Sequence, residues 1–192
     1  MVIKQLLIIG FVWPEPNSSA AGSRMMQLIE TFQSSNYQIV FATACVKSEN
    51  AFNLETIGVQ QVSIELNNVS FDEFVKELSP DIVLFDRFMI EEQFGWRVAK
   101  YCPDAMRILD TEDLHALRQA RHQALKQGRD LKLIDLNSDL AKREVAAIFR
   151  SDLSLIISDF ELNLLQTHFH VPSQLMTHSP FMFDLTGLDQ PK

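Results

Sequence analysis

The chain has 192 residues, of which 46% are hydrophobic and 22% charged, and its 17 Lys and Arg against 25 Asp and Glu give a formal net charge of −8. This composition is typical of one globular domain and excludes disordered and collagen-like classes. The acidic balance without a basic run argues against nucleic acid as a partner, because phosphates recruit Lys and Arg. Cys45 and Cys102 match no Cys-x-x-Cys spacing, which indicates a reducing compartment and no zinc or redox site.

The first ten residues are apolar enough to be mistaken for the start of a signal sequence. Their apolar core, Leu6 to Ile9, is too short for a secretory segment and no small-residue cleavage site follows it, so we interpret it as a buried strand. No run approaches the roughly 18 apolar residues that span a bilayer. We therefore expect no transmembrane segment and a cytoplasmic location.

Seven β-rich runs alternate with helical patterns along the chain. Four of these runs are continuously apolar, as expected when helices cover both faces of a sheet. The pattern predicts a Rossmann-like, doubly wound α/β domain over residues 1–180, with a parallel sheet of about seven strands, the first strand central, and helices on both faces. The expected strands are Gln5–Gly10, Gln38–Ala44, Gln61–Glu65, Ile82–Asp86, Met106–Asp110, Leu153–Ser158 and Gln174–His178.

Helical periodicity fills the intervals between the strands. The first expected helix, Ser18–Ser35, has apolar residues at the i, i+3, i+4 and i+7 spacing of one buried face, and Asn17 or Ser18 is its expected cap. The further expected helices are Phe71–Leu78, Glu91–Tyr101, Glu112–Gln127, Ser138–Arg150 and Phe160–Phe169.

The last residues lose this periodicity. Residues 181–192 are interpreted as a tail or a truncated interdomain linker. We expect the apolar residues around Pro180, Phe181, Met182 and Phe183 to form an exposed face, because such a linker would pack against a second domain.

In an open α/β sheet, ligands bind at the carboxyl ends of the strands. The loop after the first strand matches neither G-x-G-x-x-G nor a P-loop, but it ends in small residues at a helix N-terminus, which favours an anion or a hydroxyl-rich ligand. A helix cap on a long loop is an equal alternative. The candidate binding residues of this loop and helix start are Asn17, Ser18, Ser19, Gly22 and Arg24.

Polar residues follow two further strands. Arg87 comes after the fourth strand, and Ser158 and Glu161 come after the sixth. Each is a candidate for lining a site, and each is alternatively a helix cap or a surface charge.

The densest polar group follows the fifth strand. A helix here would place Thr111, His115, Arg118 and His122 on one stripe, with the apolar residues facing the core. A His beside carboxylates at a strand end can accept a proton near neutral pH. The alternative is a capping cluster, in which Asp110 or Thr111 caps the helix start and His115 is exposed without a functional role. The histidine spacings indicate no metal site, and no G-x-S-x-G elbow is present.

The order of these segments resembles the amino-terminal domain of GT-B glycosyltransferases, with a family-4-like pattern over about residues 4–180. Asp-Thr-Glu-Asp-Leu-His and the stretch from Asp152 to Glu161 are its most specific pieces. The matching segments are Pro14-x-Pro16, Gly22-Ser-Arg24, Asn36–Ala42, Pro80–Asp86, Ile108–Arg118, Glu144 and Arg150–Glu161.

In that family the amino-terminal half binds the acceptor, and a second Rossmann-like half binds the nucleotide sugar. The resemblance implies the acceptor-binding half of an enzyme that transfers a sugar from a nucleotide-sugar donor to a glycan or other acceptor. The chain lacks the donor half, so we expect it to be inactive alone and to pair with a donor-binding domain or partner chain. No cofactor is expected.

The resemblance also places the Asn17–Gly22 loop and His115 on the wall of the cleft, with Ser158 and Glu161 behind them. His115 and Asp113 are the candidates for a catalytic base if the enzyme inverts configuration. An alternative interpretation, from another functional class, is a non-catalytic binding or interaction module that keeps the fold without the chemistry.

Overall fold

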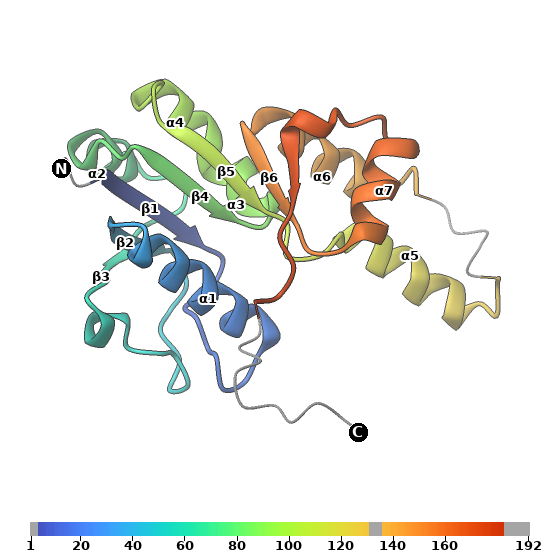
Figure 1. Cartoon of the computed structure of the whole chain (residues 1–192), viewed down its shortest axis with the longest axis horizontal. Helices are drawn as coiled ribbons and strands as arrows, with labels where there is room; N and C mark the ends of the chain where they lie inside the picture. The colour runs from blue at the N-terminus through green and yellow to red at the C-terminus, as the bar shows by residue number, and fades with distance from the viewer. Residues whose placement is uncertain (1–3, 131–135, 183–192) are drawn as a thin grey trace.

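The computed structural model describes residues 4–130 and 136–182. In these ranges one parallel sheet runs in the order β3-β2-β1-β4-β5-β6-β7 (Figure 1), which confirms the expected doubly wound α/β class. The first strand is an inner strand, but β4 occupies the middle of the sheet, one place from where we expected the centre. The strands are β1 (Lys4–Gly10), β2 (Tyr37–Thr43), β3 (Gln60–Ser63), β4 (Ile82–Asp86), β5 (Met106–Asp110), β6 (Leu153–Ile156) and β7 (Met176–His178).

The helices follow the expected segments, with three larger differences in where they begin; in addition, η1 and η4 were not expected. The first helix begins at Ala20 and is capped by Ser19, the segment expected at Glu91 starts earlier and contains a π turn, and the helix expected at Glu112 begins at His115. The helical elements are α1 (Ala20–Ser34), η1 (Leu54–Ile57), α2 (Ser70–Leu78), α3 (Phe88–Ile90), the π turn η2 (Glu91–Gly95), α4 (Trp96–Tyr101), α5 (His115–Lys126), α6 (Asp139–Arg150), α7 (Asp159–Thr167) and η4 (Ser173–Leu175).

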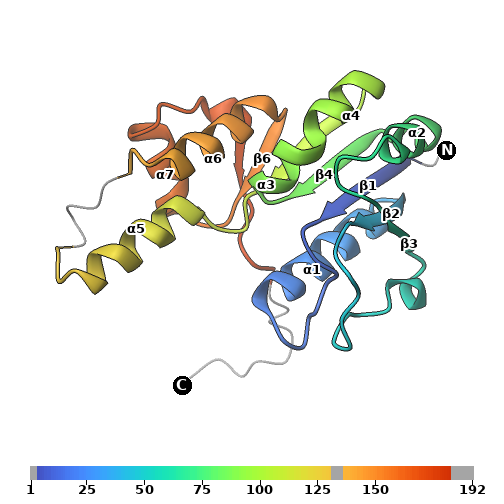
Figure 2. The ribbon, with the colours of Figure 1, turned by 180° about the vertical axis from the view of Figure 1, so that it is seen from behind.

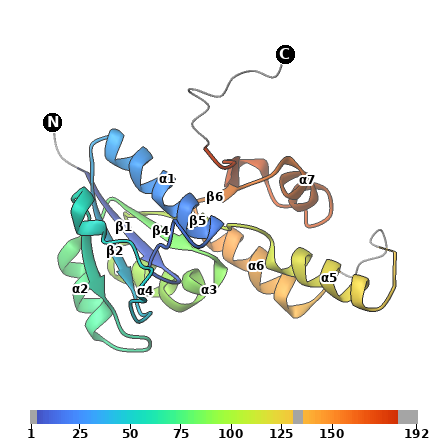
Figure 3. The same ribbon diagram turned by 90° about the horizontal axis from the view of Figure 1, so that it is seen from below.

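Both faces of the sheet are covered, which explains the continuously apolar strands. Along β1, Leu6 and Ile8 pack with α1 and η1, whereas Leu7 and Ile9 pack with α2, α4 and α6, and all four side chains are fully buried. Figures 2 and 3 show α1 on one side of the sheet and α2, α3, α4 and α6 on the other. Because β2 and β4 flank β1 and the chain reverses its winding there, the carboxyl ends of β1 and β4 form the switch point of the fold.

Among the described residues, the longest helix is α1, with 15 residues. None of these helices combines the length and the apolar character that crossing a membrane requires.

Candidate functional site

A cavity of about 350 Å³ opens beside the switch point, at the carboxyl ends of the strands. Its wall combines the start of α1 with the segments that follow β4, β5, β6 and β7. Of the residues expected at the site, Ser19, Arg24, Arg87, Asp113 and Arg118 line it together. The other lining residues are Ala20, Ala21, Glu112, Ile157 and Phe181.

Arg24 forms a buried ion pair at the base of this cavity. Its Nε lies 3.0 Å from both carboxylate oxygens of Asp110, and its Nη2 lies 2.8 Å from Oδ1. Nη1 donates to the carbonyl of Ser179, 2.7 Å away, and the ring of Phe181 lies 5.9 Å from the guanidinium carbon. The side chains of Arg24 and Asp110 are 1% and 0% exposed. Arg24, which the sequence suggested as a ligand-binding residue, thus joins α1 to β5 and to the segment after β7.

We expect Arg24→Met to lower the free energy of unfolding by about 3–5 kcal/mol, because it leaves Asp110 buried without a partner. The double variant Arg24→Met/Asp110→Leu should recover most of that loss, since no buried charge remains. Urea unfolding of the variants measures both effects. Arg107→Met is the matched control: it breaks a more exposed pair with Asp152 and should cost at most about 1 kcal/mol. Equal losses for the two single variants would contradict this account.

Arg87 and Glu112 form an ion pair at the carboxyl ends of β4 and β5. Arg87 Nη2 and Nε lie 2.8 and 3.1 Å from Glu112 Oε2, and the guanidinium carbon lies 5.0 Å from the ring of Phe11. Both residues have left-handed backbone, with φ of 74° and 60°. Such conformations cost about 1–3 kcal/mol each in side-chain-bearing residues and cluster at ligand sites. Asn36, Asn67, Ser79 and His170 have left-handed backbone elsewhere in the chain, so the cavity and its ion pairs, and not the strain, mark this edge.

Asp86 is buried just below Arg87. Its Oδ2 accepts a hydrogen bond from the backbone N–H of Phe11, 2.9 Å away, whereas Oδ1 has no hydrogen-bond partner and lies 3.6 Å from Arg87 Nε. Burial raises the pKa of this carboxyl to about 7, although Arg87 opposes the shift. The folded protein therefore binds this proton more tightly than the unfolded chain does.

The pKa of the Asp86 carboxyl rises from 3.8 in the unfolded chain to about 7 in the folded protein. The stability that the bound proton contributes is therefore fully present below pH 3.8 and is lost as the pH rises through about 7. We expect the stability of the wild type relative to Asp86→Asn to fall between these two pH values. Chemical denaturation at a series of pH values measures the difference. A difference that does not vary with pH would show that Asp86 ionises normally in the folded chain.

Asp113, His115 and Arg118 form a small group at the start of α5. Asp113 and Arg118 line the cavity, whereas His115, which we expected on the wall of the cleft, is not among its lining residues. Arg118 Nη1 lies 3.0 Å from one oxygen of Asp113, and His115 Nε2 lies 3.5 Å from the other. The His115 ring also packs edge-on against Phe88, with the ring centres 5.6 Å apart. Burial lowers the pKa of the imidazole while Asp113 opposes the shift, so His115 is neutral and able to accept a proton near pH 7.

The N-terminus of α5 is capped by two carboxylates from other helices. Glu144 of α6 accepts hydrogen bonds from the N–H groups of His115 and Ala116, both at 2.7 Å, and Glu161 of α7 accepts one from Leu114 at 3.0 Å. Burial raises the pKa of Glu144 to about 7 and also raises that of Glu161. Glu161, a candidate ligand-binding residue, is thus buried against α5, and neither Asp110 nor Thr111 caps this helix.

The expected polar stripe of Thr111, His115, Arg118 and His122 lacks its first member, because α5 begins only at His115. Thr111 precedes the helix and is buried, and its hydroxyl donates to the carbonyl of Leu155, 2.9 Å away. Thr111 therefore ties β5 to β6 and does not face a ligand.

The remaining candidates lie in turns and caps. Asn17, Ser18 and Ser19 are exposed, and the Ser19 hydroxyl accepts from the N–H of Gly22, 2.9 Å away. Gly22 is buried where a Cβ would lie 2.4 Å from the Glu15 backbone, so it allows α1 to approach the loop. Ser158 caps α7 by accepting from the N–H of Glu161.

The segment after β7 returns across α1. The backbone N–H of Met182 donates to Oε1 of Gln27, 3.0 Å away, and Phe181 is half-buried over the cavity. Phe181 is therefore less exposed than we expected, whereas Met182 is 39% exposed. Phe183 and the rest of the expected tail lie outside the described residues.

Sequence reasoning missed a larger cavity, of about 570 Å³, at the carboxyl ends of β2 and β3. The rule that ligands bind where strands end applies to the loop after β2 as well. That loop carries no motif, and the residue order alone does not bring Asn53 and Gln61 beside it. Among residues 4–130 and 136–182, no group of His, Cys, Asp and Glu is arranged to hold a metal ion.

No protein-family model and no curated protein sequence matches the chain. Its fold is similar to those of several solved GT-B glycosyltransferases. The galactosyltransferase WaaB of the lipopolysaccharide outer core is 14% identical, with a TM-score of 0.57 over 90% of this chain and 44% of that one. Sucrose-phosphate synthase from Thermosynechococcus elongatus is 10% identical, with a TM-score of 0.59 over 92% and 48%.

A third similar structure is an α-glucosyltransferase in complex with UDP and DNA, with 12% identity and a TM-score of 0.50 over 94% of this chain and 43% of that one. The chain thus spans less than half the length of each of these three proteins. At such identities the likeness concerns the fold, and it confirms the expected resemblance to one half of a GT-B structure.

Proposed function

We propose that this chain is the acceptor-binding half of a glycosyltransferase, which needs a separate donor-binding half to transfer a sugar from a nucleotide-sugar donor. The observation that carries the proposal is the extent of the structural match. About nine-tenths of this chain aligns with less than half of each glycosyltransferase, one of them bound to UDP. The cavity beside the switch point supports it, because Ser19, Arg87, Asp113 and Arg118 meet there.

In the proposed reaction, an acceptor hydroxyl oxygen bonds to the anomeric carbon of the donor sugar while the bond from that carbon to the nucleotide diphosphate breaks. The hydroxyl proton passes to a base on this chain if the transfer inverts configuration. His115 and Asp113 are the candidates. The lowered pKa of His115 favours the imidazole, because a neutral ring has a free lone pair at the pH of the cell.

The charges around the cavity suit an uncharged acceptor. Arg87 is paired with Glu112, and Arg118 with Asp113, so each guanidinium is neutralised by a neighbouring carboxylate. The diphosphate of the donor would therefore find little uncompensated positive charge here. We infer that its binding energy comes from the donor half.

The isolated chain should transfer no sugar from UDP-glucose or UDP-galactose to oligosaccharide acceptors and should bind these donors with a Kd above roughly 1 mM. Without the second half, the term for bringing the reactants together, which reaches roughly 7–11 kcal/mol in well-oriented reactions, is lost. A radiolabel transfer assay and titration calorimetry test this. Turnover by the chain alone, or tight donor binding, would contradict the half-enzyme proposal.

In an active complex with a donor-binding half, His115→Ala should lower kcat by roughly 10²-fold or more. The variant should unfold within about 1.5 kcal/mol of the wild type, since its main lost contact is the aromatic one with Phe88. His122→Ala, further along the same helix, is the control and should leave kcat unchanged. A large loss of stability with unchanged kcat per folded molecule would make His115 structural.

A further inference from the structure

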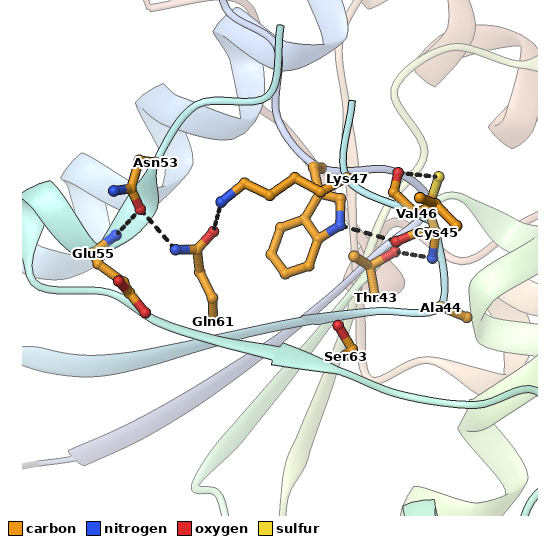
Figure 4. A pocket seen from close by; sticks show the side chains of 10 residues that line it. Thr43, Ala44, Cys45, Val46, Lys47, Asn53, Glu55, Gln61 and Ser63 are labelled. Atoms are coloured by element: carbon orange, nitrogen blue, oxygen red, sulfur yellow. Dashed lines mark hydrogen bonds between the residues drawn. The ribbon is translucent and has the colours of Figure 1, made fainter. Parts of the chain in front are cut away.

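A second cavity lies at the carboxyl ends of β2 and β3, beside the edge of the sheet (Figure 4). Its volume of about 570 Å³ is within the range typical of small-molecule sites. Thr43 ends β2, Ser63 ends β3, and the loop after β2 supplies Cys45 and Lys47. The cavity is separate from the one beside the switch point, and the two share no lining residue.

A row of polar side chains runs along one side of the cavity, as Figure 4 shows. Lys47 Nζ donates to Oε1 of Gln61, 2.8 Å away, and Gln61 Nε2 donates to Oδ1 of Asn53, also 2.8 Å away. The same Asn53 oxygen caps η1 through the N–H of Glu55. These hydrogen bonds link the three side chains, and N–H donors of the ammonium and of both amides remain for a ligand.

The floor of the cavity is partly apolar. The Trp13 indole is 5% exposed, and its Nε1 donates to the carbonyl of Cys45, 2.9 Å away. The ring therefore has no unmet polar group, and it forms a mostly covered apolar floor that packs against Phe41. Lys47 Nζ lies 5.5 Å from the centre of the ring, so the ammonium sits between this surface and the polar row.

The charges of the lining are balanced. Lys47 is the cation and Glu55 the anion among the ten lining residues. A phosphate or diphosphate would meet one positive and one negative group, whereas recognition of phosphate uses uncompensated positive charge or converging N–H groups. Amides, hydroxyls, one ammonium and one carboxylate instead match hydroxyl groups, which both donate and accept hydrogen bonds.

The cavity is connected to the candidate site through the loop between β1 and α1. The N–H of Phe52 donates to the carbonyl of Pro14, 2.8 Å away, and the Ser48 hydroxyl bonds to the carboxylate of Glu15. Trp13 at the start of this loop lines the larger cavity, and Ser19 at its end lines the smaller one. The same loop therefore borders both cavities.

We propose that the cavity at the ends of β2 and β3 binds a neutral sugar unit of the acceptor, set back from the sugar that receives the transferred group. The polar row of Lys47, Gln61 and Asn53 bonds to the hydroxyls of that unit, and Trp13 forms the apolar floor beneath the row. This inference rests on the proposed function and adds a distal acceptor subsite to it.

The test is an NMR titration of the isotope-labelled chain with maltose, lactose and cellobiose, with glucose 6-phosphate as a charged probe. We expect at least one neutral disaccharide to shift the backbone signals of Thr43, Lys47 and Gln61. Gln61→Ala should weaken that binding about three- to tenfold, the loss expected for one or two hydrogen bonds to the ligand. Gln93→Ala is the matched control, because Gln93 donates to Asn67 in a like amide pair, also 2.8 Å long, outside the cavity.

The outcomes separate the two proposals. Shifts confined to the smaller cavity, around Arg87 and Arg118, would overturn the distal subsite and leave the acceptor-half proposal standing. No shift with any neutral sugar, or equal effects of Gln61→Ala and Gln93→Ala, would also overturn the subsite. Tighter binding of glucose 6-phosphate than of every neutral sugar would contradict its neutral character. If the chain alone transfers sugar while Gln61→Ala still weakens binding, the half-enzyme proposal fails and the subsite stands.

Discussion

The buried pair of Arg24 and Asp110 is the interaction on which the functional edge of this molecule depends. One guanidinium bonds to a carboxylate at the end of β5 and to the backbone after β7, and its own helix follows the β1 loop. Removing two charges from water is costly, so the pair persists only because its geometry and hydrogen bonds are nearly complete. The three segments that it joins surround the smaller cavity, so the shape of that cavity depends on this pair.

The acidic residues of this edge divide into two groups by what they contact. Asp86, Asp110, Glu144 and Glu161 are buried and accept hydrogen bonds from backbone N–H groups or from Arg24. They fix loops and helix starts, in the way that capping side chains do elsewhere. Asp113 is more exposed, at 27% of its side chain, and lies beside His115. The acids that look alike in sequence therefore differ in their availability to a substrate.

The two cavities lie along one edge because a parallel sheet gathers all its carboxyl ends there. The β1 loop separates them and contributes to both walls.

Sequence by itself determined the strands, their parallel arrangement and most of the helices of this protein. In runs such as Leu6 to Ile9, the side chains on both faces of the strand are buried, so consecutive residues are all apolar and the strand is visible in the sequence. The rule for strand ends also located Arg87, Asp113 and Arg118 at one cavity.

Tertiary structure alone decided what the individual polar side chains do. Arg24 and Asp110 are 86 residues apart, and Leu114 and Glu161 are 47 apart. Nothing in their local sequence distinguishes a ligand-binding arginine from one held by a buried carboxylate, or a cleft glutamate from a helix cap. The polar row at the ends of β2 and β3 was hidden for the same reason, because Asn53 and Gln61 meet only through the path of the intervening loop. Local periodicity reports which face a residue occupies, whereas the partner of its polar atoms depends on strand order and loop path, and these are properties of the whole fold.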